Sequence, residues 1–322
     1  MSDSKSTVYE AAVAGGNLKV GRYVDLLVDV AFKRVFGQPA NKDLLKALLS
    51  AVIPEVKIKD LKYLDKEKVG SSEGDKKSVF DLLCETDSGE EVLIEIQLSP
   101  QDFFRDRTLY YVSQELLWQH KQGEQVYTLA PTYVISFLNF AMKHETDSKE
   151  KYVWRYALRE EQTGELMTKA LNFTYVELPK FTKTEGELAN LEDKFYFCLA
   201  HMGRLGERPG NLDGEIFRKL FEVAEFAKMD HAQQRQYLAK MTTERDIKNQ
   251  IAYARNEGLA EGEAKGKAEG KAEGLAEGEA KGKAEGLAEG KLAIARMMKA
   301  DGAEPSKIAL YTGLTLEEIK NL

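Results

Sequence analysis

The 322-residue chain has little of what marks secreted, membrane or zinc-binding proteins. Its two cysteines, Cys84 and Cys198, lie in apolar segments, so they predict neither a disulfide framework nor the paired thiols of a zinc site. The four histidines are scattered without ligand spacing. No apolar run approaches the ~18–20 residues that cross a bilayer, and residues 1–20 lack a secretion signal. We therefore expect a soluble, cytoplasmic protein without a membrane segment.

An excess of positive charge is also missing. With 46 basic and 53 acidic residues the net charge is −7, which excludes a general basic coat for nucleic acid but not a local basic patch. Lysines are crowded before residue 80: Lys57, Lys59, Lys62, Lys66, Lys68, Lys76 and Lys77. Such a stretch could follow a phosphate backbone. For any single lysine, solvation of a sheet edge is an equally good interpretation.

Apolar periodicity predicts a mixed α/β fold. Helical spacing marks residues 25–37, 41–53, 102–121 and 188–257, and strand-like runs mark 56–64, 78–86, 91–99 and 131–140. An outlying hairpin is expected over 151–178, turning near Thr163 and Gly164. We divide the chain into an N-terminal arm (1–22), a core (23–185), a helical region (186–257), a repeat segment (258–290) and a small helical C-terminal element (291–322).

The repeat segment has a glycine at every fourth position from Gly258 to Gly290, in units such as GLAEGEAKGKAEG. Alanine, glutamate and lysine favour a helix, whereas each glycine opposes it by roughly 1 kcal/mol relative to alanine. Two interpretations stay open. A glycine stripe lets two helix backbones approach closely, which would produce a homo-oligomer through this segment. Alternatively, the segment is a solvated spacer, which would reach about 50 Å if it were helical throughout.

The last residues, SKIALYTGLTLEEIKNL, resemble half of a helix-turn-helix, with Thr315 capping the final helix. That helix carries one basic residue, Lys320, and two glutamates. A helix that reads the major groove normally carries more cationic side chains. We favour a small packing or oligomerisation element over a DNA reader.

The stretch FDLLCETDSGEEVLIEIQ, residues 80–97, places acids inside two apolar runs. The residues DSG at 87–89 predict a three-residue hairpin loop that pairs Thr86 with Glu90. In this register Asp81 lies directly opposite Glu95, with Cβ atoms about 5 Å apart, and Gln97 shares their face. The other face is apolar and predicted to be core: Leu82, Cys84, Ile94 and Ile96.

Two carboxylates at this separation repel each other unless a cation neutralises them. A divalent ion does so, and Mg²⁺ is commonly held by one or two carboxylates and water. Solvent exposure at a sheet edge, or a salt bridge to Lys76 or Lys77, is the alternative interpretation. A third acid, Asp29, lies on the first helix together with Asp25, and either could point toward the sheet.

These motifs together carry a family resemblance. The series DVAFKRVFG, an aspartate-bearing strand, EIQ and RTLYYVSQELLWQHKQGEQVYTLAPTYVISFLNF resembles the PD-(D/E)XK nuclease family transposases, also called recombination-promoting nucleases. The glycine repeat and the closing ALYTGLTLEEIKNL resemble that family too, so the similarity runs from about Tyr23 to the C-terminus. The resemblance implies a restriction-endonuclease-like core, a mixed sheet flanked by helices, with a helical C-terminal extension. It also implies metal-dependent hydrolysis of phosphodiester bonds.

The resemblance assigns roles to three residues of the hairpin and one of the first helix. Asp81 and Glu95 match the catalytic, metal-binding carboxylates, and Asp29 matches an acid that binds metal directly or through water. Gln97 stands where the wider superfamily has a catalytic lysine. A glutamine there would orient the attacking water but cannot supply positive charge.

DNA contacts are expected on two helices. Arg107 and Tyr111 fall where the family has an arginine and a tyrosine after EIQ, and with Lys33 they are the predicted DNA-binding residues. For Tyr110, Tyr111 and Trp118, core packing is favoured over base stacking. The leading hypothesis is a Mg²⁺- or Mn²⁺-dependent DNA endonuclease in recombination, mobile-element movement or defence. The alternative is a catalytically weak nuclease-fold scaffold that binds DNA or protein and oligomerises through its repeat.

Overall fold

The computed structural model describes residues 9–13, 16–64, 80–119, 128–146 and 150–322, with side chains described from Val20 onward. Its first strands, β1 (Tyr9–Val13) and β2 (Gly16–Val20), pair antiparallel, with Val13 opposite Gly16. The described part of the predicted arm is therefore a hairpin and not a loose segment. Apolar and polar residues alternate poorly there, as the adjacent Ala11 and Ala12 show, so the pattern that indicates a strand is weak.

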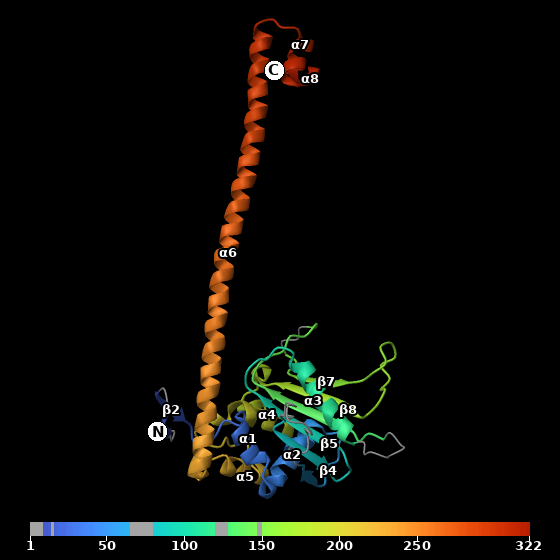
Figure 1. Ribbon diagram of the computed structural model, residues 1–322, viewed down its shortest axis with the longest axis vertical. Coiled ribbons are helices and arrows are strands. Elements are labelled where there is room, and N and C mark those ends of the chain that lie inside the picture. The colour runs from blue at the N-terminus through green and yellow to red at the C-terminus, as the bar shows by residue number, and fades with distance from the viewer. Residues whose placement is uncertain (1–8, 14–15, 65–79, 120–127, 147–149) are drawn as a thin grey trace, which may run out of the picture. The chain divides into compact units, whose positions relative to one another are not determined.

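A six-stranded mixed sheet forms the centre of the fold (Figure 1). In spatial order its strands are β3 (Leu61–Tyr63), β4 (Leu82–Thr86), β5 (Glu91–Gln97), β6 (Thr132–Leu138), β8 (Leu171–Glu177) and β7 (Val153–Ala157). The three strands β5, β6 and β8 run parallel, and the other neighbours are antiparallel. The predicted hairpin over 151–178 forms, but it is not outlying, because β8 inserts between β6 and β7 and pairs with β6 along its full length.

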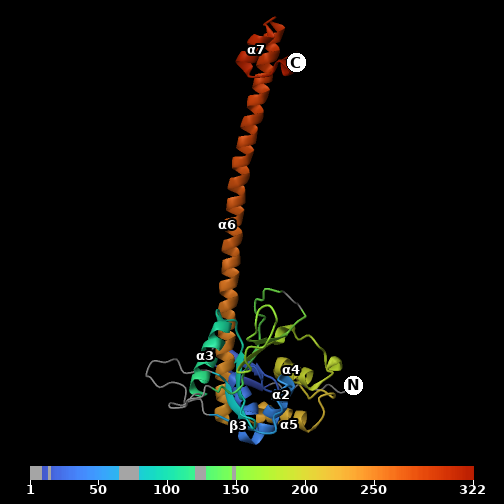
Figure 2. The same cartoon turned by 90° about the vertical axis from the view of Figure 1, so that its right-hand side faces the viewer.

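Helices cover both faces of this sheet (Figure 2). One face packs against α1 (Asp29–Phe36), α2 (Lys42–Val52), α4 (Leu191–His201) and α5 (Glu215–Val223), and the other against α3 (Phe104–Gln119). Short 3-10 helices are η1 (Pro39–Asn41), η3 (Leu178–Lys180), η4 (Glu185–Glu187), η5 (Met202–Arg204) and η6 (Phe226–Lys228). The predicted architecture, a mixed sheet flanked by helices with a helical C-terminal extension, is confirmed.

Alternation along the strands separates two apolar clusters. On β5, Val92, Ile94 and Ile96 belong to the large core beneath the four helices, whereas Leu93 packs with Val112 of α3 in a smaller cluster. This is the period of two expected of a strand. The predicted core residues are confirmed as buried members of the large cluster: Leu82, Cys84, Ile94 and Ile96. Leu93 lies two residues from Glu95 on β5, so the face that carries Asp81 and Glu95 is partly apolar as well.

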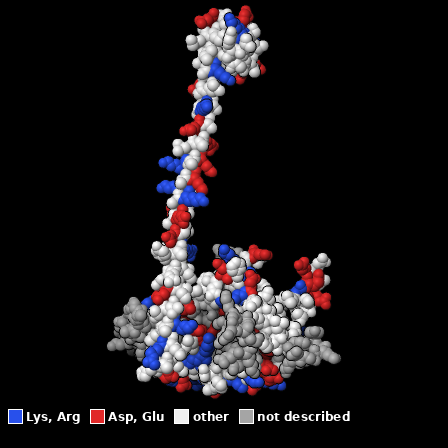
Figure 3. All heavy atoms as spheres, viewed as in Figure 1, with Lys and Arg blue, Asp and Glu red and all other residues white. Residues whose placement is uncertain are grey.

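The chain divides into two compact units, Met1–Lys248 and Asn249–Leu322. The helix α6 (His231–Ala300) includes the whole repeat, so residues 258–290 are helical and exposed along their length. Charged side chains of both signs line this exposed helix (Figure 3). Packing against a partner helix stays a prediction, as do the five segment boundaries. No helix within the described residues is long and apolar enough to cross a membrane.

The second unit closes on a small core of its own. After α6, α7 (Pro305–Thr312) and α8 (Leu316–Lys320) bury Ile308 and Ile319 against Ala295. Gly313 ends α7 with a φ of 74°, a left-handed conformation that glycine adopts without steric cost. The Thr315 hydroxyl accepts from the Glu318 amide, so the predicted cap of the final helix is confirmed.

Candidate active site

The hairpin β4–β5 has the register that its loop predicts. The Thr86 amide donates to the Glu90 carbonyl at 2.9 Å, and Leu82 pairs with Ile94 further along the ladder. Gly89 has a φ of 91°, which the turn requires. A three-residue loop with glycine in this position fixes which side chains share a face, so the sequence determines this register locally.

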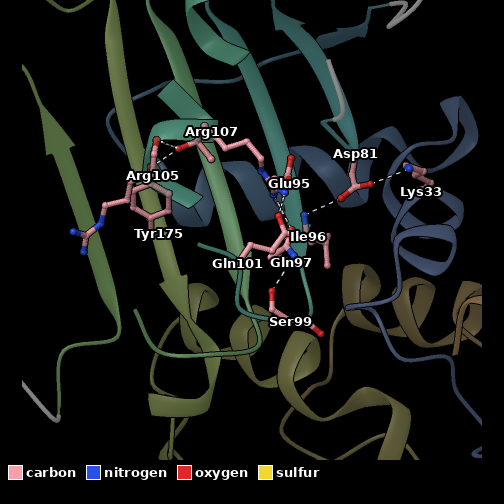
Figure 4. Close-up of polar contacts among 11 residues, drawn as sticks. Lys33, Asp81, Glu95, Ile96, Gln97, Ser99, Gln101, Arg105, Arg107 and Tyr175 are labelled. Atoms are coloured by element: carbon pink, nitrogen blue, oxygen red, sulfur yellow. Dashed lines mark hydrogen bonds and ion pairs between the residues drawn. The ribbon is translucent and has the colours of Figure 1, made fainter. Parts of the chain in front are cut away.

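Asp81 lies just before β4, and its carboxylate ties it to β5. The Asp81 amide donates to the Ile94 carbonyl at 2.8 Å, and the Ile96 amide donates to Asp81 Oδ2 at 2.8 Å (Figure 4). The regular ladder ends at Leu82, so the predicted backbone pair of Asp81 with Glu95 is not part of it. Asp81 instead takes the place of a backbone acceptor, which holds its carboxylate beside the strand that carries Glu95.

A chain of charges extends from Asp81 to two helices. Lys33 of α1 places Nζ 2.9 Å from Asp81 Oδ1 and 3.6 Å from Asp29 Oδ2. Lys240 of α6 places its Nζ 3.3 Å from the same Asp29 oxygen. Burial opposes the charged form of Lys33, but the nearby Asp81 and Asp29 outweigh it and raise the pKa of Lys33 above its ordinary value. The salt bridge predicted as an alternative for Asp81 is therefore made by Lys33, whereas Lys76 and Lys77 lie outside the described residues.

Asp29, and not Asp25, faces the site. Asp25 is half-buried outside the pocket: its Oδ1 accepts from the Leu27 amide, its own amide donates to the Tyr237 hydroxyl, and desolvation raises the pKa of its carboxyl. Asp29 stands at the first position of α1, where a carboxylate also interacts favourably with the helix dipole.

Glu95 has an arginine as its partner. Arg107 of α3 directs Nη2 to Glu95 Oε1 at 2.6 Å and to Gln97 Oε1 at 2.8 Å, and its Nη1 donates to Gln101 Oε1. Gln97 in turn donates from Nε2 to the Ser99 carbonyl at 2.9 Å. The predicted residues Glu95, Gln97 and Arg107 are thus in direct contact (Figure 4).

The aromatic residues of α3 divide between the two sides of the helix. Tyr111 is half-buried and packs edge-on against Phe80, with ring centroids 5.8 Å apart. Tyr110 is 56% exposed and Trp118 52% exposed, so core packing was wrong for these two. The residues that α3 buries follow its sheet-facing side: Phe104, Thr108, Val112 and Glu115. That narrow stripe leaves four apolar side chains of α3 exposed, which a count of apolar residues does not reveal: Leu109, Tyr110, Leu117 and Trp118.

One pocket of about 310 Å³ collects these groups. Its charged and polar lining comes from the two carboxylates and their surroundings: Asp29, Asp81, Glu95, Gln97, Gln101, Arg107, Tyr111, Lys240 and Glu244. Sequence reasoning missed Gln101, Lys240 and Glu244. The last two lie in the charged helix α6, about 150 residues after the hairpin, and nothing in its local pattern distinguishes a pocket residue from a solvated one.

The donor set fits a hard divalent cation, because Asp81 and Glu95 present carboxylate oxygens to the same pocket. Within the described ranges, no three of the His, Cys, Asp and Glu side chains are grouped closely enough to hold a metal ion. Lys33 and Arg107 occupy the places beside the two carboxylates. The assignment of Asp81, Glu95 and Asp29 as metal ligands therefore stays a prediction.

Comparison with known proteins supports the resemblance for the first unit. Residues 26–254 match the model of the PD-(D/E)XK nuclease family transposase, which is more than half of the chain. The match ends before the glycine repeat, so it does not extend to the C-terminus as the sequence motifs suggested. No curated protein and no solved structure shows a significant match. The chain belongs to the PD-(D/E)XK nuclease family transposases.

Proposed function

We propose that the protein is a Mg²⁺- or Mn²⁺-dependent DNA endonuclease that hydrolyses phosphodiester bonds. The observation that carries this proposal is the pair of carboxylates in one pocket. Asp81 and Glu95 are only 6% and 5% exposed, yet both line the same cavity together with the cations Arg107 and Lys240. A well-formed pocket with a few convergent polar groups is the default candidate for an active or binding site.

The residues of the pocket have distinct tasks in such a reaction. Asp81 and Glu95 would hold the metal, with Asp29 nearby, and the bound metal would supply a Lewis acid that lowers the pKa of water at the scissile phosphate. Arg107 is placed to contact a non-bridging phosphate oxygen, and Lys33 and Lys240 lie where they can neutralise neighbouring phosphates. Tyr111 forms the wall of the pocket on the α3 side.

Cleavage of supercoiled plasmid tests the proposal. Asp81→Asn and Glu95→Gln keep the side-chain volumes but remove the charges that would bind metal, so each is expected to abolish nicking in Mg²⁺ and in Mn²⁺. Glu85→Gln is the matched control, because Glu85 lies on β4 in the same hairpin as the two acids but outside this pocket. Full activity of the Asp81 and Glu95 variants would overturn the proposal.

A catalytically weak scaffold is the second candidate, and the ion pairs favour it. Asp81 and Glu95 each have a cationic side chain beside them, so each of these two carboxylates already has a counter-ion within the protein. Calorimetric titration with Mn²⁺ separates the two functions. A nuclease should bind the ion at a site that disappears in Asp81→Asn, whereas a scaffold should give the same weak heat with both proteins.

We also propose that the repeat segment joins copies of the chain. The support is its helical, fully exposed glycine stripe, at which an added Cβ would meet nothing within the chain itself. Truncation after Asn256 followed by light scattering tests this, and an unchanged mass per particle, after subtraction of the removed residues, would refute it. A role in recombination, mobile-element movement or defence and a cytoplasmic location stay predictions.

A further inference from the structure

Gln97 is engaged at both ends of its amide. Its oxygen accepts from Arg107 Nη2 at 2.8 Å, and its nitrogen donates to the Ser99 carbonyl at 2.9 Å. The two contacts require opposite chemistry, an acceptor toward the guanidinium and a donor toward the carbonyl, so they fix the orientation of the amide. An amide held in this way directs its oxygen at the guanidinium of Arg107.

Arg107 is held by three acceptors that converge on one guanidinium. Glu95 Oε1 and Gln97 Oε1 share Nη2, Gln101 Oε1 accepts from Nη1, and the guanidinium carbon lies 5.0 Å from the centroid of the Phe104 ring. The side chain remains 26% exposed and lines the pocket. A planar guanidinium with a fixed fork of donors loses little further freedom when it binds a phosphate, provided that its plane is already set.

We propose that Gln97 is a positioning residue for Arg107. Together with Gln101 it sets the plane of the guanidinium in the lining of the pocket, and Arg107 supplies the positive charge at the phosphate that a glutamine at position 97 lacks. This inference rests on the proposed nuclease function. It differs from the role expected from the sequence alone, in which Gln97 acts directly on the attacking water. Arginine stays protonated at all ordinary pH values, so Arg107 stabilises charge and transfers no proton.

A kinetic double-mutant cycle on the full chain separates the two roles. Arg107→Gln is expected to lower kcat by about 100-fold, the usual loss for one donor to a transition-state charge, and Gln97→Ala by about 10-fold. If Gln97 acts through Arg107, the double variant loses no more than Arg107→Gln alone. Additive losses would overturn the proposal. Arg105→Gln is the matched control, since Arg105 lies on the same helix but points away from Glu95 (Figure 4), and it should stay within about 2-fold of wild type.

Rescue by charge gives a readout that a purely structural role would not move. A lysine at position 97 would extend from β5 toward the pocket that Gln97 lines. Gln97→Lys in the Arg107→Gln background is expected to recover about 10-fold in kcat, whereas Gln97→Met, of similar length but neutral, recovers nothing. In the presence of Arg107, Gln97→Lys should instead lower kcat, because two cations would then be adjacent. Failure of the lysine to rescue would contradict the proposal.

Two further measurements keep the outcomes distinct. Urea unfolding of every variant shows whether a loss of kcat follows a loss of fold, and Arg107→Lys provides a variant that retains the charge beside Glu95 if Arg107→Gln does not fold. In the Arg107→Lys background, Gln97→Ala should cost less than in wild type, because an ammonium has no plane to be set; an equal cost would contradict the proposal. If the wild-type protein cuts no DNA with either metal, the proposed function fails. If it cuts DNA and the cycle is additive, only the positioning role fails.

Discussion

On the β5 side of the pocket, Glu95 meets one arginine that two glutamines also hold, whereas on the β4 side Asp81 meets a lysine that it shares with Asp29. The β5 side is built from residues 95–107, which are close in the sequence, and Arg107 is 26% exposed. The β4 side takes its charges from α1 and α6, and Lys33 and Lys240 are 38% and 51% exposed. We infer that the guanidinium is a fixed part of the site and the two ammonium groups are exchangeable.

The largest expected effect is a difference in stability between the two sides. Arg107→Met removes the guanidinium from the buried carboxylate of Glu95 and also removes the donor to the side-chain oxygens of Gln97 and Gln101. It should therefore lower the free energy of unfolding by about 2–3 kcal/mol. Lys33→Met should cost about 1 kcal/mol or less, because Lys33 is more exposed and water screens its ion pairs. Urea unfolding at pH 7 measures both. Equal losses would remove the distinction between a fixed and an exchangeable side.

A second prediction uses Glu115, the buried acid of α3, whose charged neighbour is acidic and not basic. Glu115 is 7% exposed, and burial together with the charge of Glu91 raises the pKa of its carboxyl to about 7. The folded state therefore binds a proton that the unfolded state has already released between about pH 4.5 and pH 7. Stability should fall as the pH rises through that window and stay lower above it.

Glu115→Gln tests whether protonation removes the cost of burying the Glu115 charge, as the ion pair with Arg107 does for Glu95. The amide is neutral at every pH, so the variant should be about 1–2 kcal/mol more stable than wild type at pH 8 and nearly equal to it at pH 4. Urea unfolding across this range checks the slope. Asp106→Asn, an exposed acid on the same helix, should show no such slope between pH 5 and pH 8. A stability difference that is independent of pH would contradict the assignment.

The same contrast between near and distant residues explains what the sequence could predict. The register of β4 and β5, and so the face shared by Glu95 and Gln97, follows from the loop at 87–89 and the alternation of local side chains. Arg107 could be placed only through the family resemblance, because a helix that follows a strand can pack in many orientations. Lys240 and Glu244 had no signal at all, since only the path of the folded chain brings the start of α6 to the pocket.

The predictions that were wrong concern features that depend on tertiary packing and not on the local sequence. The hairpin of β7 and β8 carries its own turn at Gly164, but its insertion beside β6 depends on a parallel pairing that no local pattern encodes. Asp81 leaves the regular ladder because its side chain bonds to the Ile96 amide, a competition between side chain and backbone that alternation does not show. Tyr110 and Trp118 are exposed because α3 buries only one narrow stripe.

The smallest expected effect concerns Lys240, the outermost charge of the β4 side. If its ammonium is exchangeable, it can leave Asp29 and contact a phosphate. Lys240→Met should then weaken binding of a DNA duplex in the absence of metal by about 2–5-fold, and it should reduce the salt dependence of the binding constant by about one phosphate contact. Fluorescence anisotropy between 50 and 200 mM salt, roughly the range over which phosphate contacts are lost, measures the slope. Lys271→Met, in the exposed repeat, is the matched control. An unchanged slope in Lys240→Met would mean that Lys240 only neutralises Asp29, and the β4 side would then be as fixed as the side that holds Arg107.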